Sequence, residues 1–286
     1  MADKTPQYVR SLHIKARRGD AEAQAELADR YYDGDGVVQN FREAVRYYRL
    51  AAAQGHAGAQ CNLGVCYEKG RGVAKDEVEA VRYYRLAAAQ GDADAQCNLG
   101  ICYRNGTGVA KDEGEAVRYY RLAVAQGHAG AQINLGFCYD NGIGVAKDEI
   151  EAVRYYRLAA AQGDAYAQFN LGDCYENGNG VVARDVAAAV KWYQLAAAQG
   201  LTDARAALER LGQPWLGTAV LAAPNSSSPL AMVPVRPGGL PCDVCFIECS
   251  PQYCAACGVP KYCSKACQRL AWKGGHKAAC PGKKQA

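Results

Sequence analysis

A segment of 36 residues recurs through most of this 286-residue chain. Nearly identical copies begin at His56, Asp92 and His128, a copy that is one residue longer begins at Asp164, and a degenerate copy begins at Asp20. A fixed period of about 20 to 50 residues is the signature of an array in which one supersecondary unit stacks on its neighbours. The fold therefore has to be read from one unit and from the way in which the units stack.

Each unit is predicted to be a hairpin of two helices. In the first helix, Ala59, Leu63 and Tyr67 fall at i, i+4 and i+8 and share one face, which we interpret as the core face. The glycine-rich block at residues 70–72 then ends this helix. Gly64 lies inside the helix, where glycine costs about 1 kcal/mol relative to alanine. Because this glycine returns in the later units, we expect the backbone of another helix to pass close to it.

The second helix is expected to begin at Asp76, whose carboxylate can accept from free N–H groups of the first turn, with Glu79 as its capping-box partner. The equivalent pairs in other units are Asn40/Glu43, Asp112/Glu115 and Asp148/Glu151. Tyrosine pairs such as Tyr83/Tyr84 follow on this helix. They could form a platform for stacked bases, but they recur in step with the alanines of the same helix, which favours packing between units.

The pattern A-x-x-x-L-G-x-x-Y-x-x-G-x-G-V-x-x-D resembles the Sel-one-like repeat, a relative of the tetratricopeptide repeat, over residues 9–212. Tetratricopeptide arrays are the alternative, but their period is about 34 residues and they lack the G-x-G-V turn. The resemblance implies an all-α fold, a right-handed α/α superhelical solenoid that serves as an interaction scaffold and has no catalytic residues.

Half-units are expected at both ends of the array. Residues 9–19 align with the second helix of a unit, and residues 201–212 supply a lone first helix with Ala204 and Leu208 in the core positions. Two half-units and five hairpins predict twelve helices.

The 14 cysteines fall into two groups. Six lie on first helices of the repeat, namely Cys61, Cys66, Cys97, Cys102, Cys138 and Cys174. The second helices have no cysteine, so no disulfide partner is available within a unit, and we expect buried or ordinary free thiols without a metal or redox role.

The other eight cysteines lie between Cys242 and Cys280. The chain there reads C-x2-C-x8-C-x2-C-x5-C-x3-C-x8-H-x3-C, and the predicted metal ligands are Cys242, Cys245, Cys254, Cys257, Cys263, Cys267, His276 and Cys280. Seven thiols and one imidazole make two tetrahedral sets with no open position, which predicts two structural Zn²⁺ ions. A segment this short cannot bury a sufficient core, so we expect it to be unfolded without metal. A disulfide framework is the alternative, but no secretory signal precedes it.

This segment, residues 242–280, resembles the MYND zinc finger. A RING finger is the alternative, but its last ligands are C-x2-C and its histidine lies inside the motif, whereas this segment ends in H-x3-C. The resemblance implies interleaved ligand pairs, with Cys242, Cys245, Cys263 and Cys267 on one zinc and Cys254, Cys257, His276 and Cys280 on the other. It also implies that Gln268 and Trp272 line a groove for proline-containing peptides, with P-x-L-x-P as the favoured spacing.

Composition divides the chain into a solenoid at 9–212, a linker rich in proline and serine at 213–241, the finger at 242–280 and a basic tail at 281–286. The formal net charge is +4. Seven zinc-bound thiolates would outweigh the charge of two Zn²⁺ ions, which leaves the loaded protein close to neutral. A nucleic-acid partner is therefore not expected.

A second stripe on the first helices differs from unit to unit. At about 100° per residue it lies opposite the face that holds Ala59, Leu63 and Tyr67. We predict that a peptide of a partner binds there; the predicted residues are Ile101, Arg104, Ile133, Phe137, Tyr166 and Phe169. The alternative is that these residues pack between neighbouring units and vary because packing is forgiving.

These observations predict a non-enzymatic adaptor with a solenoid groove and a peptide-binding finger. No nucleophile with a base, phosphate loop or open metal site stands out, and the solenoid and finger leave no room for the methyltransferase domain that accompanies some MYND fingers. The alternatives are a nuclear corepressor-like regulator and a substrate adaptor of a methyltransferase or ubiquitin-ligase assembly. The sequence shows neither a membrane span nor a secretory signal, so we expect an intracellular protein, cytoplasmic or nuclear.

Overall fold

The computed structural model describes residues 7–181 and 183–217. Within these residues the chain forms twelve helices and no strands. The helices are α1 (Gln7–Arg17), α2 (Ala21–Asp33), α3 (Phe41–Ala53), α4 (Ala57–Lys69), α5 (Glu77–Ala89), α6 (Ala93–Asn105), α7 (Glu113–Ala125), α8 (Ala129–Asn141), α9 (Glu149–Ala161), α10 (Ala165–Asn177), α11 (Val186–Ala198) and α12 (Thr202–Arg210).

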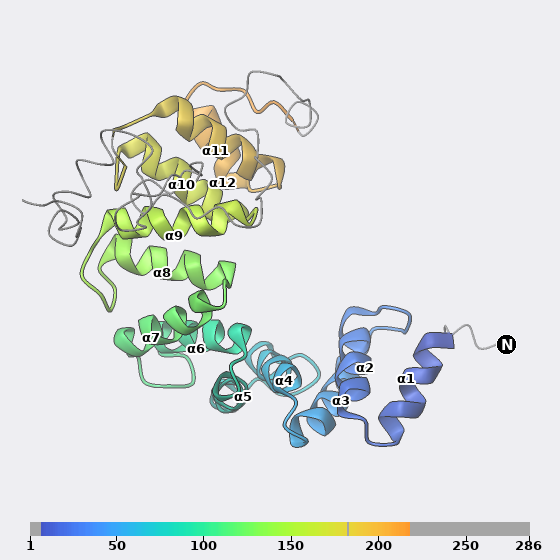
Figure 1. The fold of residues 1–286 in the computed structure, drawn as a ribbon. Helices are drawn as coiled ribbons and strands as arrows, with labels where there is room; N and C mark the ends of the chain where they lie inside the picture. The colour runs from blue at the N-terminus through green and yellow to red at the C-terminus, as the bar shows by residue number, and fades with distance from the viewer. Residues whose placement is uncertain (1–6, 182, 218–286) are drawn as a thin grey trace, which may run out of the picture. The chain divides into compact units, whose positions relative to one another are not determined.

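The helices pack in the order in which they occur along the chain. The first and second helices of a unit form the tightest pairs, from α2 with α3 to α10 with α11, and each second helix then packs on the first helix of the next unit. Figure 1 shows these hairpins following one another, with α1 and α12 at the two ends of the series. The all-α solenoid of helix hairpins that the repeat predicts is confirmed.

The two glycines of the G-x-G turn have different roles: the first ends the first helix, and the second contacts the preceding unit. Gly70 ends α4 in the left-handed conformation, with φ at 66°. Gly72 also has a positive φ, 73°, and a Cβ on it would lie 2.1 Å from the carbonyl oxygen of Phe41, at the start of α3. In the next unit, Gly108 makes the same approach to the carbonyl of Glu77, which lies in the unit before its own. The turn of each unit therefore fits against the start of the second helix of the unit before it.

The N-caps of the second helices form as predicted, but the capping box does not. The carboxylate of Asp76 accepts from the N–H groups of Val78 and Glu79 at 3.1 and 3.0 Å. The N–H of Asp76 itself donates to the carbonyl of Tyr67 at 3.0 Å, so it does not need the Glu79 side chain. Glu79 instead forms an ion pair with Arg82 at 2.9 Å. The turn supplies the acceptor that the capping box would have supplied.

The glycine inside each first helix makes room for a ring. A Cβ on Gly64 would lie 2.6 Å from the ring of Tyr84, and the backbone carbonyl of Ala80 would be further away, at 3.2 Å. Our expectation of a close helix backbone is therefore confirmed, and the nearest neighbour is the fully buried tyrosine ring of the second helix.

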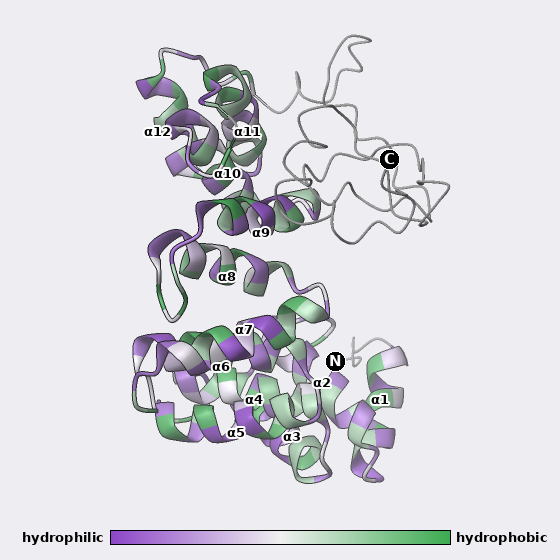
Figure 2. Ribbon diagram, turned by 60° about the vertical axis from the view of Figure 1, so that its left-hand side comes forward, coloured by the Kyte–Doolittle hydropathy of each residue, from purple (hydrophilic) through white to green (hydrophobic). Residues whose placement is uncertain are grey.

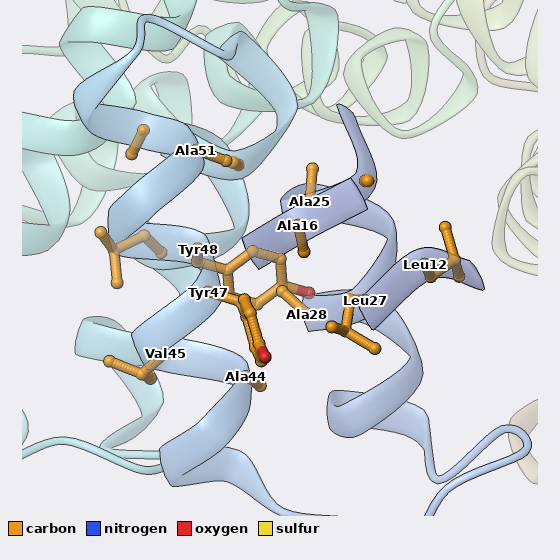
Figure 3. Packing of buried hydrophobic residues seen from close by; sticks show 14 of the residues in the cluster. Leu12, Ala16, Ala25, Leu27, Ala28, Ala44, Val45, Tyr47, Tyr48 and Ala51 are labelled. Carbon is orange, nitrogen blue, oxygen red and sulfur yellow. The ribbon is translucent and has the colours of Figure 1, made fainter. Parts of the chain in front are cut away.

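Alanine, leucine and tyrosine fill the core between the helices. In Figure 3, the side chains of Leu12 on α1, Leu27 on α2 and Tyr47 and Tyr48 on α3 come together at the first junction. In Figure 2, hydrophilic and hydrophobic residues are seen on the same helices, as expected for amphipathic helices. The other tyrosine of each pair packs as well, since the rings of Tyr83 and Tyr67 stack 5.7 Å apart.

Buried glutamines of the first three units, Gln24, Gln60 and Gln96, each donate to a carbonyl of the preceding helix. Gln60 donates to the carbonyl of Ala52 in the preceding unit at 3.1 Å and accepts from the side chain of Gln90 in its own unit at 2.7 Å. The same amide contact, at 2.8 to 2.9 Å, is made by Gln54/Gln24, Gln126/Gln96, Gln162/Gln132 and Gln199/Gln168. These buried amides are thus satisfied by hydrogen bonds, as burial requires.

The half-units close the array as predicted. Ala204 and Leu208 of α12 are fully buried in the core positions of a first helix. Beyond α12, the side chain of Gln194 donates to the carbonyl of Pro214 at 2.8 Å and accepts from the N–H of Leu216 at 3.2 Å. The beginning of the segment that we expected to be a linker therefore lies against α11, and its later apolar pieces fall outside the described residues.

Candidate partner-binding surface

The six stripe residues do not form one continuous exposed surface. Three of them, Ile101, Ile133 and Phe169, are half-buried and pack against cores that neighbouring units share. The ring of Phe169 also lies 5.5 Å from that of Tyr193 in its own unit. These three contacts match the alternative interpretation, in which the varied positions serve packing.

The exposed part of the stripe consists of Phe137 and Tyr166, with the half-buried Arg104 beside them. Phe137 is 41% exposed and Tyr166 is 62% exposed. The guanidinium of Arg104 on α6 lies 5.7 Å from the ring centroid of Phe137 on α8, within the range of a cation–π contact. The pair therefore spans the junction between the third and fourth units and presents an aromatic face and a cation together.

Cysteines occupy the most buried position of the varied stripe. Cys61 and Cys97, which stand where Ile133 and Phe169 stand in later units, are buried. The sulfur of Cys97 accepts weakly from the side chain of Asn134 at 3.8 Å. Periodicity on one helix misses this burial, because the second helix of the same unit and the next unit cover one edge of the stripe.

An asparagine that is identical in the copies was missed by our focus on varied positions. Asn134 accepts from Arg104 at 3.1 Å and donates to the carbonyl of Gly130 at 2.9 Å. The equivalent Asn62 donates to the carboxylate of Asp29 in the preceding unit at 3.0 Å. The sequence signal for this residue was that the same asparagine returns in the copies. The asparagine places a polar side chain beside the exposed stripe.

The charge at one stripe position changes along the stack. Glu68 accepts from the hydroxyl of Tyr84 at 2.5 Å, Arg104 takes the same position in the next unit, and Asp140 follows. Burial raises the pKa of Asp140, while Lys147 lowers it. Glu176, the last in the series, is buried, and its hydrogen bond from Arg210 lowers its pKa. Each unit thus presents a different electrostatic environment at an equivalent place.

The six repeat cysteines are free and buried, as predicted. Burial raises the pKa of Cys66 and Cys97 to about 11, so both are protonated thiols at neutral pH. Within residues 7–217, leaving out 182, no group of three or more histidine, cysteine or acidic residues is placed to hold a metal ion. No helix in this part of the chain is long and apolar enough to cross a membrane.

The finger's predicted metal ligands, Cys242, Cys245, Cys254, Cys257, Cys263, Cys267, His276 and Cys280, lie outside the described residues, as do Gln268 and Trp272.

Models of two families match the chain. The Sel1 repeat matches residues 21–56, 57–92, 93–128, 129–164 and 165–201. The MYND finger matches residues 242–280, which implies that this segment binds zinc. No curated protein matches the chain.

Solved structures match the repeat part. A Sel1 repeat protein from Oxalobacter formigenes is 38% identical, with a TM-score of 0.67 over 72% of this chain and 84% of its own. The protein c5321, a protective antigen of uropathogenic Escherichia coli strains with an SLR fold, is 36% identical, with a TM-score of 0.65 over 74% of this chain and 47% of its own, so this chain spans about half of it. A Sel1 repeat protein from Klebsiella pneumoniae is 21% identical and shares the fold, with a TM-score of 0.50 over 72% of this chain and 99% of its own.

The five Sel1 matches cover well over half of the chain, and each begins at the first residue of one of the helices α2, α4, α6, α8 and α10. The chain therefore belongs to the Sel1 repeat family, and it carries a MYND finger after its repeats.

Proposed function

We propose that this protein is a non-enzymatic adaptor that holds two protein partners, one on the exposed stripe of the solenoid and one at the finger. Sel1 repeats and MYND fingers are both protein-interaction modules, which supports this class of function. The observation that carries the proposal is the Arg104–Phe137 pair, because an exposed aromatic ring beside a cation is the kind of anchor that interfaces use.

The contrast between Phe137 and its neighbour Leu135 provides the test. Leu135 is fully buried, so Leu135→Ala is expected to cost about 2 to 5 kcal/mol of unfolding free energy. Phe137→Ser is expected to cost less than about 1 kcal/mol, because surface changes are usually small. The full chain is used to capture partner proteins, which are then measured by quantitative mass spectrometry. A set of proteins that the unchanged chain captures should be lost with the Phe137→Ser variant. If Phe137→Ser lowers stability as much as Leu135→Ala, the ring is a core residue and the stripe is not a binding surface.

For the finger, we propose two structural Zn²⁺ ions held by the eight predicted ligands at 242–280. Seven thiols and one imidazole are the donors that Zn²⁺ prefers in closed tetrahedral sites, and the spacing supplies short pairs for each ion.

We further propose that Gln268 and Trp272 bind a proline-containing peptide. A fluorescent peptide with P-x-L-x-P spacing is expected to bind the full chain and to lose affinity with Gln268→Ala and Trp272→Ala. Retained affinity in both zinc-loaded variants would place the peptide elsewhere.

A further inference from the structure

The hydroxyl of Tyr120 is buried and has no hydrogen-bond partner within the described part of the chain. Equivalent tyrosines of other second helices do have an acceptor: Tyr84 donates to Glu68 at 2.5 Å, and Tyr193 donates to Glu176 at 2.9 Å. An unpaired buried hydroxyl is costly, so it calls for an explanation.

Arg104 accounts for the missing acceptor. It stands 16 residues before Tyr120, as Glu68 stands 16 residues before Tyr84, and it brings donors where the other unit brings a carboxylate. Its own hydrogen bonds go to the neutral amide oxygens of Asn134 and Asn105, at 3.1 and 3.5 Å. Burial raises the pKa of Tyr120 and Arg104 opposes that rise, as expected for a guanidinium near the hydroxyl. Two kinds of donor are therefore present without an anionic acceptor.

Elsewhere in the chain, a tyrosine hydroxyl and an arginine guanidinium donate to one shared carboxylate. The carboxylate of Glu176 accepts from the hydroxyl of Tyr193 and from both terminal nitrogens of the Arg210 guanidinium, one of them at 2.9 Å. Its side chain is only 7% exposed. The fold thus accommodates one glutamate carboxylate between a second-helix tyrosine and an arginine.

We propose that the third unit, residues 92–127, binds a glutamate side chain of a partner protein, whose carboxylate binds the half-buried Arg104 guanidinium and reaches the buried Tyr120 hydroxyl once Arg104 leaves Asn134. This inference rests on the proposed adaptor function and names the chemistry of the solenoid's partner. Arg104 would exchange a hydrogen bond to a neutral amide for an ion pair with a carboxylate, which can accept two parallel N–H bonds from the guanidinium. Phe137, exposed beside Arg104, would contact an apolar residue next to that glutamate.

The neighbouring unit limits which acidic segments fit. Burial raises the pKa of Asp140, and the nearby carboxylates of Glu149 and Asp173 raise it further. A run of acidic residues would meet these carboxylates, and a like charge disfavours binding. The expected partner segment therefore carries a single glutamate flanked by apolar or basic residues, which separates it from polyanions such as nucleic acid.

Two matched variants of the full chain test the orphaned hydroxyl without a ligand. Tyr84→Phe removes a made hydrogen bond and leaves Glu68 without its donor, so it should lower Tm by about 2 to 4 °C. Tyr120→Phe removes a hydroxyl that has no partner, so Tm should stay unchanged or rise. Arg104→Glu supplies the internal carboxylate that Glu68 and Glu176 supply in their units, and it should raise Tm. A loss of Tm with Tyr120→Phe equal to that of Tyr84→Phe overturns the proposal.

Binding is tested with a displayed random peptide library as the probe, selected on the full chain. The Trp272→Ala variant identifies finger ligands, which are set aside. The remaining peptides are expected to share a glutamate beside an apolar residue. Their affinity should fall at least about tenfold with Arg104→Glu, and equally when their glutamate is replaced by glutamine.

The outcomes separate this inference from the adaptor function itself. Peptides that lose affinity with Phe137→Ser but bind the Arg104→Glu variant normally would keep the solenoid as a binding surface and overturn the carboxylate site. Peptides that are insensitive to both variants would overturn the carboxylate site and the binding stripe together.

Discussion

At the scale of single residues, the junctions between units depend on polar side chains that are buried and bonded. Gln60 donates to a carbonyl of the preceding unit and accepts from an amide of its own unit, and Gln24 and Gln96 donate to the preceding helix in the same way. A buried group that keeps its partners costs little, whereas a partner left unpaired costs about 1 to 3 kcal/mol. The glutamines therefore fix the register of one unit against the next rather than adding apolar stability.

The first prediction concerns this register. Gln60→Ala removes two hydrogen bonds of a buried amide, one to the carbonyl of Ala52 and one from the side chain of Gln90, so the free energy of unfolding should fall by about 2 kcal/mol. Gln90→Ala removes the exposed member of the same contact and should cost less than about 1 kcal/mol. Urea denaturation of both variants, followed by circular dichroism, measures the difference. Equal losses would show that Gln60 acts only through its contact with Gln90.

At the scale of helices, the N-caps of the first helices alternate along the chain. His56 and His128 accept from N–H groups of their own first turn through Nδ1, so Nε2 carries the proton and donates to Glu22 and Asp94 of the preceding units, at 3.0 and 2.9 Å. Asp92 and Asp164 cap the intervening first helices. The residue 34 positions before each of these aspartates is a glycine, Gly58 and Gly130, and not an acid.

A double-mutant cycle tests this complementarity. His128→Asp keeps an acceptor for the cap but places two carboxylates together, because Asp94 already lies there. We expect a loss of about 1 kcal/mol, since the pair is partly exposed. Adding Asp94→Gly reproduces the Asp164–Gly130 arrangement and should restore most of the loss. Thermal unfolding of the two single variants and the double variant gives the coupling, and strict additivity would contradict a direct contact.

The helices could be predicted from the sequence because their signals are local. Asp76 and Gly70 mark helix ends through bonds to neighbouring residues, and the twelve helices follow from repeating those marks. The capping box failed because its acceptor comes from Tyr67, across the turn. The close helix backbone beside Gly64 was predicted, but the ring of Tyr84 was not, because one sequence position does not show which side chain of the facing helix lies against it.

The candidate site was less predictable because it depends on contacts between units. The varied stripe could be found on one helix, and Phe137 and Tyr166 are exposed on it. Ile133 is half-buried because the fourth unit's core covers it, which periodicity on one helix cannot show. The orphaned hydroxyl of Tyr120 could be recognised only when its surroundings were known.

At the scale of the whole molecule, the packing is one-dimensional within the described helices. Each unit packs on the unit before it and the unit after it. In such arrays stability is close to a sum of unit and junction terms. A change confined to the finger is therefore not expected to unfold the repeats.

The prediction at this scale is that metal removal affects one part of the chain. Chelation, or Cys263→Ala in the full chain, should release zinc and unfold residues 242–280, since each structural site contributes on the order of 10 kcal/mol. The helical circular dichroism signal and the Tm of the repeats should stay the same. Metal analysis by mass spectrometry should find two zinc ions per untreated chain. One ion or none would contradict the two-site assignment.

The alternating caps also bear on how such a chain can lengthen over generations. A tandem duplication that copies one aspartate-capped unit, such as residues 92–127, sets a new aspartate against Asp94, and one that copies a histidine-capped unit sets a histidine against Gly58. A duplication of two adjacent units reproduces every histidine with its acid and every aspartate with its glycine. The heritable module of this protein is thus a pair of units, and descendants that gain or lose whole pairs keep all their junctions intact.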